Sequence, residues 1–310
     1  MSSNKKFILI DGNAIIHRAF YAIPQSFRSK EGELVNAVYG FASMLLNILN
    51  AEKPDYIAAS FDLKGKTFRH EEYEDYKATR TKAPDGLYEQ FPKIKDLVRT
   101  FGIPIYEVQG FEADDVLGTL AVQAKDMPHL HTYIVTGDMD TLQLVDERVS
   151  VLSPVKGFKE KMVYDPDAVV KKYGLKPSQI TDLKGLQGDS SDNIKGVQGI
   201  GPKTATALLT EFGTIENIYE NIDQVKGKTQ EKLLNDKENA FFSKKLATII
   251  LDVPIELNLE DCATHEYDQE KVAELFIELE FKSLLGKLGM FNRKSAERKA
   301  TEEGKQQTLF

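Results

Sequence analysis

Short, continuously apolar segments alternate with helix-like segments in this chain, and the alternation limits its fold more than any other feature. The apolar segments are rich in β-branched and aromatic residues, as buried strands are. Helical spacing of apolar residues recurs over about 37–50, 88–100 and 113–125. Strands apolar on both faces that alternate with helices predict an α/β fold with a mostly parallel sheet. The expected strands are 7–10, 56–61, 103–108, 132–136 and 149–152.

After about Lys176 the strand-like segments stop and only helical patterns remain. Pro202 suits a first helical turn, and Gly213 can end that helix. Thr214 and Asp236 can each cap the helix that follows. The expected helices span 201–212, 214–222, 227–235, 236–250 and 268–280. We therefore expect an α/β domain over 1–175, a helical subdomain over 176–291 and a polar tail over 292–310.

The composition is that of a folded globular protein, with 41% hydrophobic and 28% charged residues in 310. Its apolar runs are too short to cross a bilayer, and its first residues do not form a secretory signal. The single cysteine, Cys262, excludes an internal disulfide and a cysteine zinc cluster, so we expect a cytoplasmic protein. The net charge of −8 argues against a nucleic-acid binder, unless the acids gather around bound cations.

Acidic residues follow four of the expected strands, directly or at the start of the next helix. The carboxyl ends of parallel strands meet at one edge of a sheet, where ligands bind. A single Asp there is often only a turn or cap residue. Seven unpaired carboxylates at one edge would instead repel one another, which calls for bound cations. The seven are Asp11, Asp62, Glu112, Asp114, Asp115, Asp138 and Asp140, and Asp189 and Asp192 could join them from the helical half.

An oxygen-only set of this kind favours Mg²⁺ or Mn²⁺ over zinc. Nine acids are too many for one octahedral ion, so two or more ions about 4 Å apart fit better, as in phosphodiester hydrolysis. Removing these nine acids from the net charge of −8 leaves +1, so the rest of the surface is not acidic.

Two further segments suggest phosphate binding. The first is the glycine-rich turn 196–201, followed by Pro202, Lys203 and Thr204, which offers backbone N–H groups at a helix start. It could also be a simple helix–turn–helix corner. The second is 64–82, where six Lys and Arg residues surround Tyr73 and Tyr76, a pattern suited to single strands or to an ordinary solvated helix face.

Taken together, these strings resemble the 5′ nuclease (flap endonuclease) family, and within it the 5′→3′ exonuclease domain of bacterial DNA polymerase I. The resemblance spans residues 7 to about 290. The matching strings are Ile10-Asp-Gly-Asn13, Phe61-Asp62, Phe68-Arg-His-Glu71, Tyr76-Lys77, Gly110-Phe-Glu-Ala-Asp-Asp115, Thr136-Gly-Asp-Met-Asp140, Gly188-Asp-Ser-Ser-Asp-Asn193 and Gly199-Ile-Gly-Pro-Lys-Thr204.

The resemblance implies a PIN-like core, a helical arch over the site and a helix–hairpin–helix subdomain. It implies one Mg²⁺ among Asp11, Asp62, Glu112 and Asp114, and another among Asp138, Asp140 and Asp189, with Asp115 and Asp192 close by. It places Lys77 and Arg80 at the scissile phosphate, Arg69 and Lys184 at further phosphates, and Tyr76 on a displaced base. It also implies a DNA-binding hairpin at Gly199, Gly201, Lys203 and Thr204, with a K⁺ ion held by backbone oxygens.

We therefore expect a monomeric, Mg²⁺-dependent 5′→3′ exonuclease and flap endonuclease that acts on DNA in replication and repair, at the nucleoid. It would be either free-standing or the N-terminal part of a longer polymerase. A DNA-junction binding module that has lost catalysis and a PIN-type ribonuclease are the alternatives. The end of the tail, Gln306-Gln-Thr-Leu-Phe310, resembles the peptides with which replication proteins bind the sliding clamp, although it could equally be a chance terminus.

Overall fold

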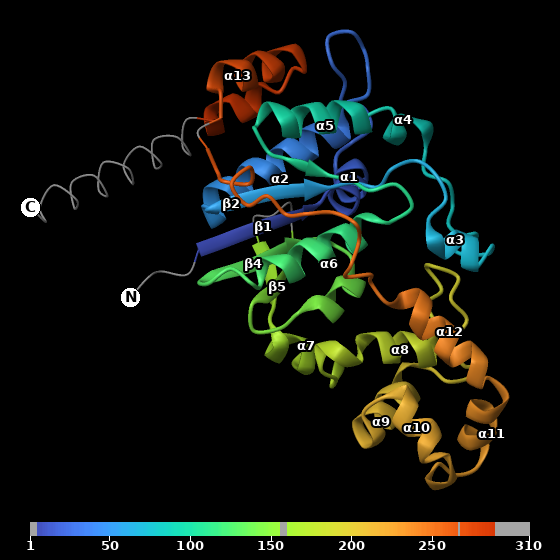
Figure 1. The fold of residues 1–310 in the computed structure, drawn as a ribbon. Helices are drawn as coiled ribbons and strands as arrows, with labels where there is room; N and C mark the ends of the chain where they lie inside the picture. The colour runs from blue at the N-terminus through green and yellow to red at the C-terminus, as the bar shows by residue number, and fades with distance from the viewer. Residues whose placement is uncertain (1–4, 156–159, 266, 289–310) are drawn as a thin grey trace, which may run out of the picture.

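The computed structural model describes residues 5–155, 160–265 and 267–288, which form a six-stranded sheet with helices on both faces and a group of helices to one side (Figure 1). The strand order is β3-β2-β1-β4-β5-β6, and every pair is parallel except β5 with β6. The strands are β1 (Lys5–Asp11), β2 (Tyr56–Ser60), β3 (Ile105–Tyr106), β4 (Leu130–Val135), β5 (Val149–Val155) and β6 (Glu160–Tyr164).

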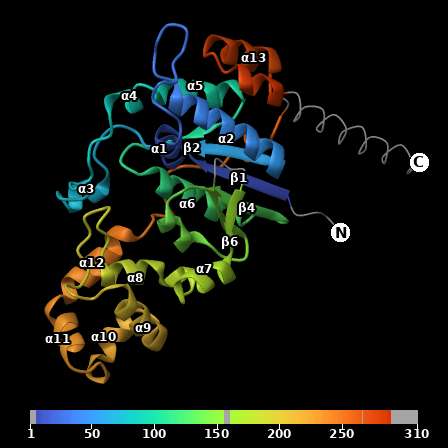
Figure 2. The same cartoon turned by 180° about the vertical axis from the view of Figure 1, so that it is seen from behind.

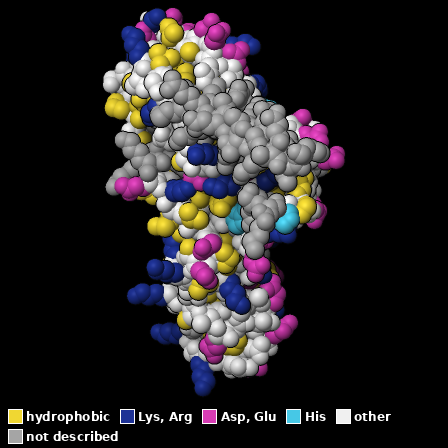
Figure 3. All heavy atoms as spheres, turned by 90° about the vertical axis from the view of Figure 1, so that its left-hand side faces the viewer, with side chains coloured by type: hydrophobic (Ala, Val, Ile, Leu, Met, Phe, Trp, Pro, Cys, Tyr) yellow, Lys and Arg dark blue, Asp and Glu magenta, His cyan; other side chains and the backbone are white. Residues whose placement is uncertain are grey.

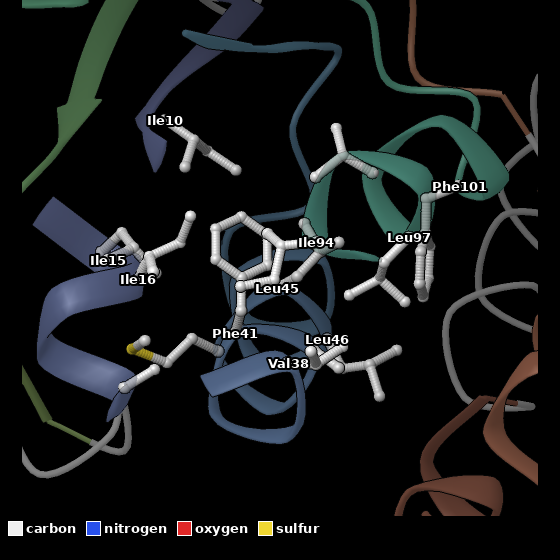
Figure 4. Close-up of a cluster of buried hydrophobic side chains, with 14 of the residues drawn as sticks. Ile10, Ile15, Ile16, Val38, Phe41, Leu45, Leu46, Ile94, Leu97 and Phe101 are labelled. Carbon is white, nitrogen blue, oxygen red and sulfur yellow. The ribbon is translucent and has the colours of Figure 1, made fainter. Parts of the chain in front are cut away.

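Alternate residues of the central strands pack on opposite faces of the sheet, which explains why their sequences are apolar throughout. In β1, Ile8 and Ile10 join one buried cluster, whereas Phe7 and Leu9 join another. The first cluster packs under α1 (Gly12–Ala22), α2 (Asn36–Glu52) and α5 (Phe91–Thr100), as Figure 4 shows. The second packs under α6 (Ala113–Ala124) and α7 (Pro166–Tyr173). The predicted α/β class is thereby confirmed.

The helical part follows α7 and has a small core of its own. Thr214 caps α10 as expected, by accepting a hydrogen bond from Asn217 N. The prediction for Asp236 is wrong, because its carboxylate accepts from Gln198 N of the glycine-rich turn instead of capping α12. The elements of the helical part are η2 (Pro177–Gln179), α8 (Ile180–Gln187), α9 (Pro202–Phe212), α10 (Ile215–Glu220), η3 (Ile222–Gln224), α11 (Lys228–Asn235) and α12 (Lys237–Ala247).

The chain then returns to the sheet. Residues 249–262 complete the second cluster, and α13 (Gln269–Glu278) adds Val272 and Phe276 to the first, beside α5. The view from behind in Figure 2 also places α13 next to α5, far from α9 and α10. The end of the segment that we assigned to the helical subdomain therefore packs with the α/β part.

Candidate active site

Four strand ends bring acidic side chains to one cavity of about 220 Å³. Asp11 closes β1, Asp62 follows β2, Glu112 and Asp114 open α6, and Asp138 opens the short helix η1 (Met139–Leu144) after β4. All five line the cavity, together with Lys77 and Arg80. The structure thus brings together five of the seven carboxylates that we expected to hold metal.

Asp11, Asp62, Asp114 and Asp138, here called the cavity carboxylates, accept hydrogen bonds only from neutral groups among the described residues. Burial raises the pKa of Asp11 to about 7, with a further contribution from Asp138. Burial also raises the pKa of Asp62 and of Asp114, and the negative charges of neighbouring carboxylates add to both shifts. Three of the four are therefore costly to ionise without a cation beside them.

The remaining acids contact cations and are here called the cation-paired carboxylates: Glu112, Asp115, Asp140, Asp189 and Asp192. Lys77 Nζ lies 2.7 Å from Glu112 Oε1, and Arg80 pairs with Asp192. The backbone N–H of Lys77 donates to the carbonyl of Asp192 at 3.0 Å, which holds Lys77 at a positive φ of 58°. These contacts hold the basic segment 64–82 at the wall of the cavity.

The basic segment is mostly turns and contains one short helix, α3 (Phe68–Glu72), while a second, α4 (Asp85–Tyr88), begins just after the segment. Tyr76 is 4% exposed, and its hydroxyl donates to Glu112 at 3.1 Å and Asp192 at 3.0 Å. Its ring is therefore not free to stack on a base in this conformation, contrary to the expectation from the resemblance.

Arg69 also differs from expectation, because its guanidinium is 2% exposed and fully used inside the protein. It forms two bonds with Asp115, at 2.7 and 2.8 Å, and donates to the carbonyls of Leu246 and Thr248 at 2.9 Å. Asp115 is 0% exposed and accepts in addition from Ile250 N. The pair cannot reach a phosphate or a metal in this conformation. It ties the basic segment, α6 and the end of α12 together.

The two remaining expected ligands, Asp140 and Asp189, are bridged by Lys184. The Lys184 ammonium lies 2.7 Å from Asp140 Oδ1 and also pairs with Asp189. Burial and the charge of Asp138 raise the pKa of Asp140 to about 6. Burial would raise the pKa of Asp189 as well, but the bonds from Lys184 and Ser191 lower it. Lys184 is half-buried, and its ammonium neutralises both carboxylates in this conformation.

Within the described residues, no three acidic, His or Cys side chains already form a metal cage. The donor set nevertheless fits divalent cations, because it offers only oxygen atoms and includes buried carboxylates with raised pKa values. Asp138 shares the cavity with the first expected group, whereas Asp140 and Asp189 lie at Lys184.

The glycine-rich turn leads into α9 in the helical part. Gly199 has a φ of +77°, and a Cβ on Gly201 would meet no atom within 4 Å, so a ligand can approach this backbone closely. Lys203 is exposed in the first turn of α9, and Thr204 is half-buried beside it. Figure 3 shows that Lys and Arg side chains project along one edge of the helical part and acids along the other.

Sequence reasoning missed the neutral residues that position the carboxylates. Asn13 donates to Asp62 at 2.5 Å, and the Thr136 hydroxyl donates to Asp11 at 2.6 Å. Both residues stand in the strings quoted above, which was the available signal. Position 12 requires glycine, because a Cβ there would lie 2.1 Å from the Phe61 ring.

Comparison with known proteins identifies this arrangement. Residues 6–174 match the family model of the 5′-3′ exonuclease N-terminal resolvase-like domain, and residues 175–270 match that of the 5′-3′ exonuclease C-terminal SAM fold. The chain belongs to the 5′-3′ exonuclease family. The expected family is thereby confirmed.

Two relatives in this family are DNA polymerases I. Identity is 45% over 92% of the chain with that of Caldicellulosiruptor bescii, and 48% over 92% with that of Bacillus caldotenax. The chain spans 34% and 32% of these two relatives, about a third of their length. The solved flap endonuclease of bacteriophage T5, in complex with DNA and metal ions, shares the fold, with a TM-score of 0.62, 23% identity, and coverage of 89% of this chain and 100% of the other.

Proposed function

We propose that this chain hydrolyses DNA phosphodiester bonds at 5′ flaps, nicks and ends, with Mg²⁺ held by the cavity carboxylates and Glu112. One observation carries this proposal: a small cavity collects five carboxylates, four of them without a cationic partner among the described residues, directly beneath Lys77 and Arg80. The family and the metal ions and DNA bound by the T5 enzyme support it.

Bound Mg²⁺, or Mn²⁺ in its place, would supply Lewis acidity and a more acidic water molecule to the reaction. The chain contributes the rest. Lys77 and Arg80 line the same cavity. On binding of DNA they would break their ion pairs with Glu112 and Asp192 and contact the scissile phosphate, where their charges stabilise the developing negative charge. Lys184 would likewise break its ion pairs with Asp140 and Asp189, and these two carboxylates would then hold a second ion. The basic segment is held against the start of α6 by the Arg69–Asp115 pair and by the hydrogen bond from Tyr76 to Glu112.

We propose that the helical part grips the duplex, through the backbone of Gly199 and Gly201 and the start of α9 at Lys203 and Thr204. The open backbone of Gly201 and the exposed Lys203 support this role. The K⁺ ion that the resemblance implies would compete with Lys232, whose ammonium already donates to Gly199 O at 2.9 Å. Duplex affinity compared in K⁺ and in Na⁺ at equal ionic strength tests that point.

The decisive experiment measures cleavage of end-labelled 5′-flap DNA, nicked duplex and single strand, with Mg²⁺, with Mn²⁺ and with EDTA. We expect cutting near the flap junction, only with metal, leaving 5′-phosphate and 3′-hydroxyl ends. A ribonuclease would instead cut a matched RNA substrate faster. A binding module would bind flap DNA in Mg²⁺ without cutting it. Either result would overturn the proposal.

We propose an α/β domain over 1–175 and a helical subdomain over 176–291, whose last segment, 249–288, packs back on the α/β domain. We also propose a monomer that acts at the nucleoid in the cytoplasm, as expected for a chromosomal DNA substrate. No helix in the described residues is long and apolar enough to span a membrane. The chain matches about a third of the length of the DNA polymerases I among its relatives, and we propose that it acts either as a free-standing nuclease or as the N-terminal part of a longer polymerase.

The expected clamp-binding peptide, Gln306–Phe310, lies outside the described residues. We propose that a peptide of residues 300–310 binds the sliding clamp with micromolar affinity, because a short segment pays ordering entropy on binding. Leu309→Ala with Phe310→Ala should abolish binding in fluorescence anisotropy and leave cleavage of free flap DNA unchanged. No binding at about 100 µM peptide would leave the tail without this role.

A further inference from the structure

Residues 248–264, here called the return segment, carry the chain from the end of α12 back to the sheet (Figure 1, orange). The return segment belongs to no helix or strand, so its backbone polar groups need other partners. Several of them bond to side chains on one face of α6, which lie at four-residue intervals: Asp115, Thr119 and Gln123. The return segment is therefore bonded to α6 along most of that helix.

Two neutral side chains form most of these bonds. Gln123 accepts from Leu257 N at 2.7 Å and donates to Ile255 O at 2.8 Å. The Thr119 hydroxyl accepts from Val253 N at 3.2 Å. A slide of the return segment along α6 would break these bonds and leave buried polar groups without partners, which costs free energy. Thr119 and Gln123 thus fix where the return segment lies on the helix.

Gly118 allows the two segments to approach closely. A Cβ at this position would lie 2.8 Å from Ile249 Cγ2 and 2.9 Å from Leu251 Cδ2. Ile249 and Thr119 are both buried. The contact is therefore packed as well as hydrogen-bonded, and packed interiors deform little.

This contact joins the two regions that a DNA substrate would have to engage together. At one end, α6 begins at the acidic cavity with Glu112 and Asp114. At the other end, the return segment continues α12, whose Ser243 hydroxyl accepts from Gly196 N of the glycine-rich turn at 3.0 Å. The bonds between α6 and the return segment therefore help to set the distance from the glycine-rich turn to the cavity carboxylates.

A small change in that distance would matter for a duplex held at the glycine-rich turn. Phosphates of one strand follow one another about every 3.4 Å along the axis of a duplex. A displacement of about half this spacing would bring the neighbouring phosphodiester as close to the cavity as the intended one. The rigidity of the contact is therefore a means of selecting one bond.

We propose that Thr119 and Gln123 determine which phosphodiester is cut, by fixing the distance from the glycine-rich turn to the metal carboxylates. This inference rests on the proposed nuclease function. Both are positioning residues, because neither lines the acidic cavity. Asp115 belongs to the same contact but also holds Arg69, so its loss would not test position alone.

The test measures the lengths of the products from 5′-flap DNA labelled at its 5′ end, in single turnovers with Mg²⁺. The wild-type chain should give one main product. Gln123→Leu removes both hydrogen bonds of the side chain at similar size. The share of products cut one nucleotide away should then rise about 5-fold, the factor for one lost hydrogen bond.

Two variants at position 119 sharpen the test. Thr119→Val lacks the hydroxyl at the same size and should shift product lengths as Gln123→Leu does. Thr119→Ser keeps the hydroxyl and should cut where the wild type cuts. The affinity for flap DNA in Ca²⁺ should be unchanged in all three variants, because the glycine-rich turn and Lys203 are intact.

Gln179→Leu is the matched control. Gln179 also accepts from a backbone N–H, that of Lys176 at 2.9 Å, and donates to a carbonyl, that of Leu209 at 3.0 Å. These partners lie within the helical part and not between it and α6, so product lengths should stay as in the wild type.

Melting temperatures in EDTA show which variants are folded, and Thr119→Val carries the test if Gln123→Leu is not. Unchanged product lengths in the folded variants, or an equal shift in Gln179→Leu, would overturn the positioning role alone. A wild-type chain that cuts no flap substrate would overturn the nuclease proposal with it.

Discussion

The cavity carboxylates and the cation-paired carboxylates lie on the same edge of the sheet but are neutralised in different ways. Each cation-paired carboxylate has a Lys or Arg partner, such as Lys77 for Glu112 or Arg69 for Asp115. The cavity carboxylates have none among the described residues, and three of them have raised pKa values. The protein therefore neutralises the cation-paired carboxylates by itself, whereas the cavity carboxylates are the group for which we propose bound Mg²⁺.

The largest expected effect comes from removing a cavity carboxylate. Asp138→Asn should lower the rate of flap cleavage by more than about 100-fold, because losing a metal ligand costs more than losing an outer contact. Binding of flap DNA in Ca²⁺ should survive. Asp126→Asn, at an exposed position away from the cavity, is the control. Near wild-type cleavage by Asp138→Asn would remove this residue from the site.

A buried cation-paired carboxylate should matter for stability instead. Asp115→Asn leaves the buried Arg69 without its main partner and should lower the free energy of unfolding by about 3 kcal/mol. Asp114→Asn, one residue away, should cost little or nothing in EDTA, because its charge has no cationic partner to lose. Urea unfolding of both variants measures the contrast. Equal losses would show that the two groups do not differ.

The cations should divide between chemistry and binding. Lys77→Ala should lower the rate of cleavage about 100-fold with little change in duplex affinity, because its proposed contact is the scissile phosphate. Lys203→Ala, in the exposed first turn of α9, should weaken duplex binding and flatten its salt dependence. Single-turnover rates and anisotropy at several salt concentrations separate the two. Similar behaviour of both variants would contradict this division.

The last expected effect is a pH dependence of stability without metal. The pKa of Asp11 is about 7 in the folded protein and about 4 when unfolded, so between these values the folded state binds more protons. Its contribution to the free energy of unfolding therefore falls as pH rises from about 4 to about 7. Asn cannot titrate, so the melting temperature of Asp11→Asn relative to wild type should rise over that range in EDTA.

Asp268→Asn is the matched control for that measurement. Hydrogen bonds from the backbone N–H and the side chain of Lys271 lower the pKa of the exposed Asp268, so its stabilising contribution is lost only as pH falls below about 4. The difference in melting temperature between this variant and wild type should not change between pH 5 and 8. Saturating Mg²⁺ should remove the trend for Asp11→Asn through its effect on the wild type. A constant difference for Asp11→Asn in EDTA would show that Asp11 titrates normally.

Much of the fold was predictable because strands and helices leave periodic patterns. The expected strand at 7–10 lies within β1, and the one at 132–136 overlaps β4 up to Val135. Several elements were missed, among them α1, β6, α7 and α8. The helix α1 begins at Gly12 and Asn13, which are poor helix signals, and β6 is an antiparallel edge strand with four of its five residues exposed. The docking of α13 on α5 is a long-range contact, which local periodicity does not encode.

Chain order alone predicts which acids can meet, because a parallel sheet delivers the carboxyl ends of all its strands to one edge. The sequence also determined the family, through strings whose spacing is local. Which of these carboxylates pair with a cation depends instead on the tertiary structure. Arg69 and Asp115 stand 46 residues apart in the sequence, and the carbonyls of Leu246 and Thr248 complete their site from the far end of the helical part. Whether a charge is buried, and against what, depends on contacts between distant segments, so Arg69 resembled a phosphate ligand in the sequence and lies in the core of the fold.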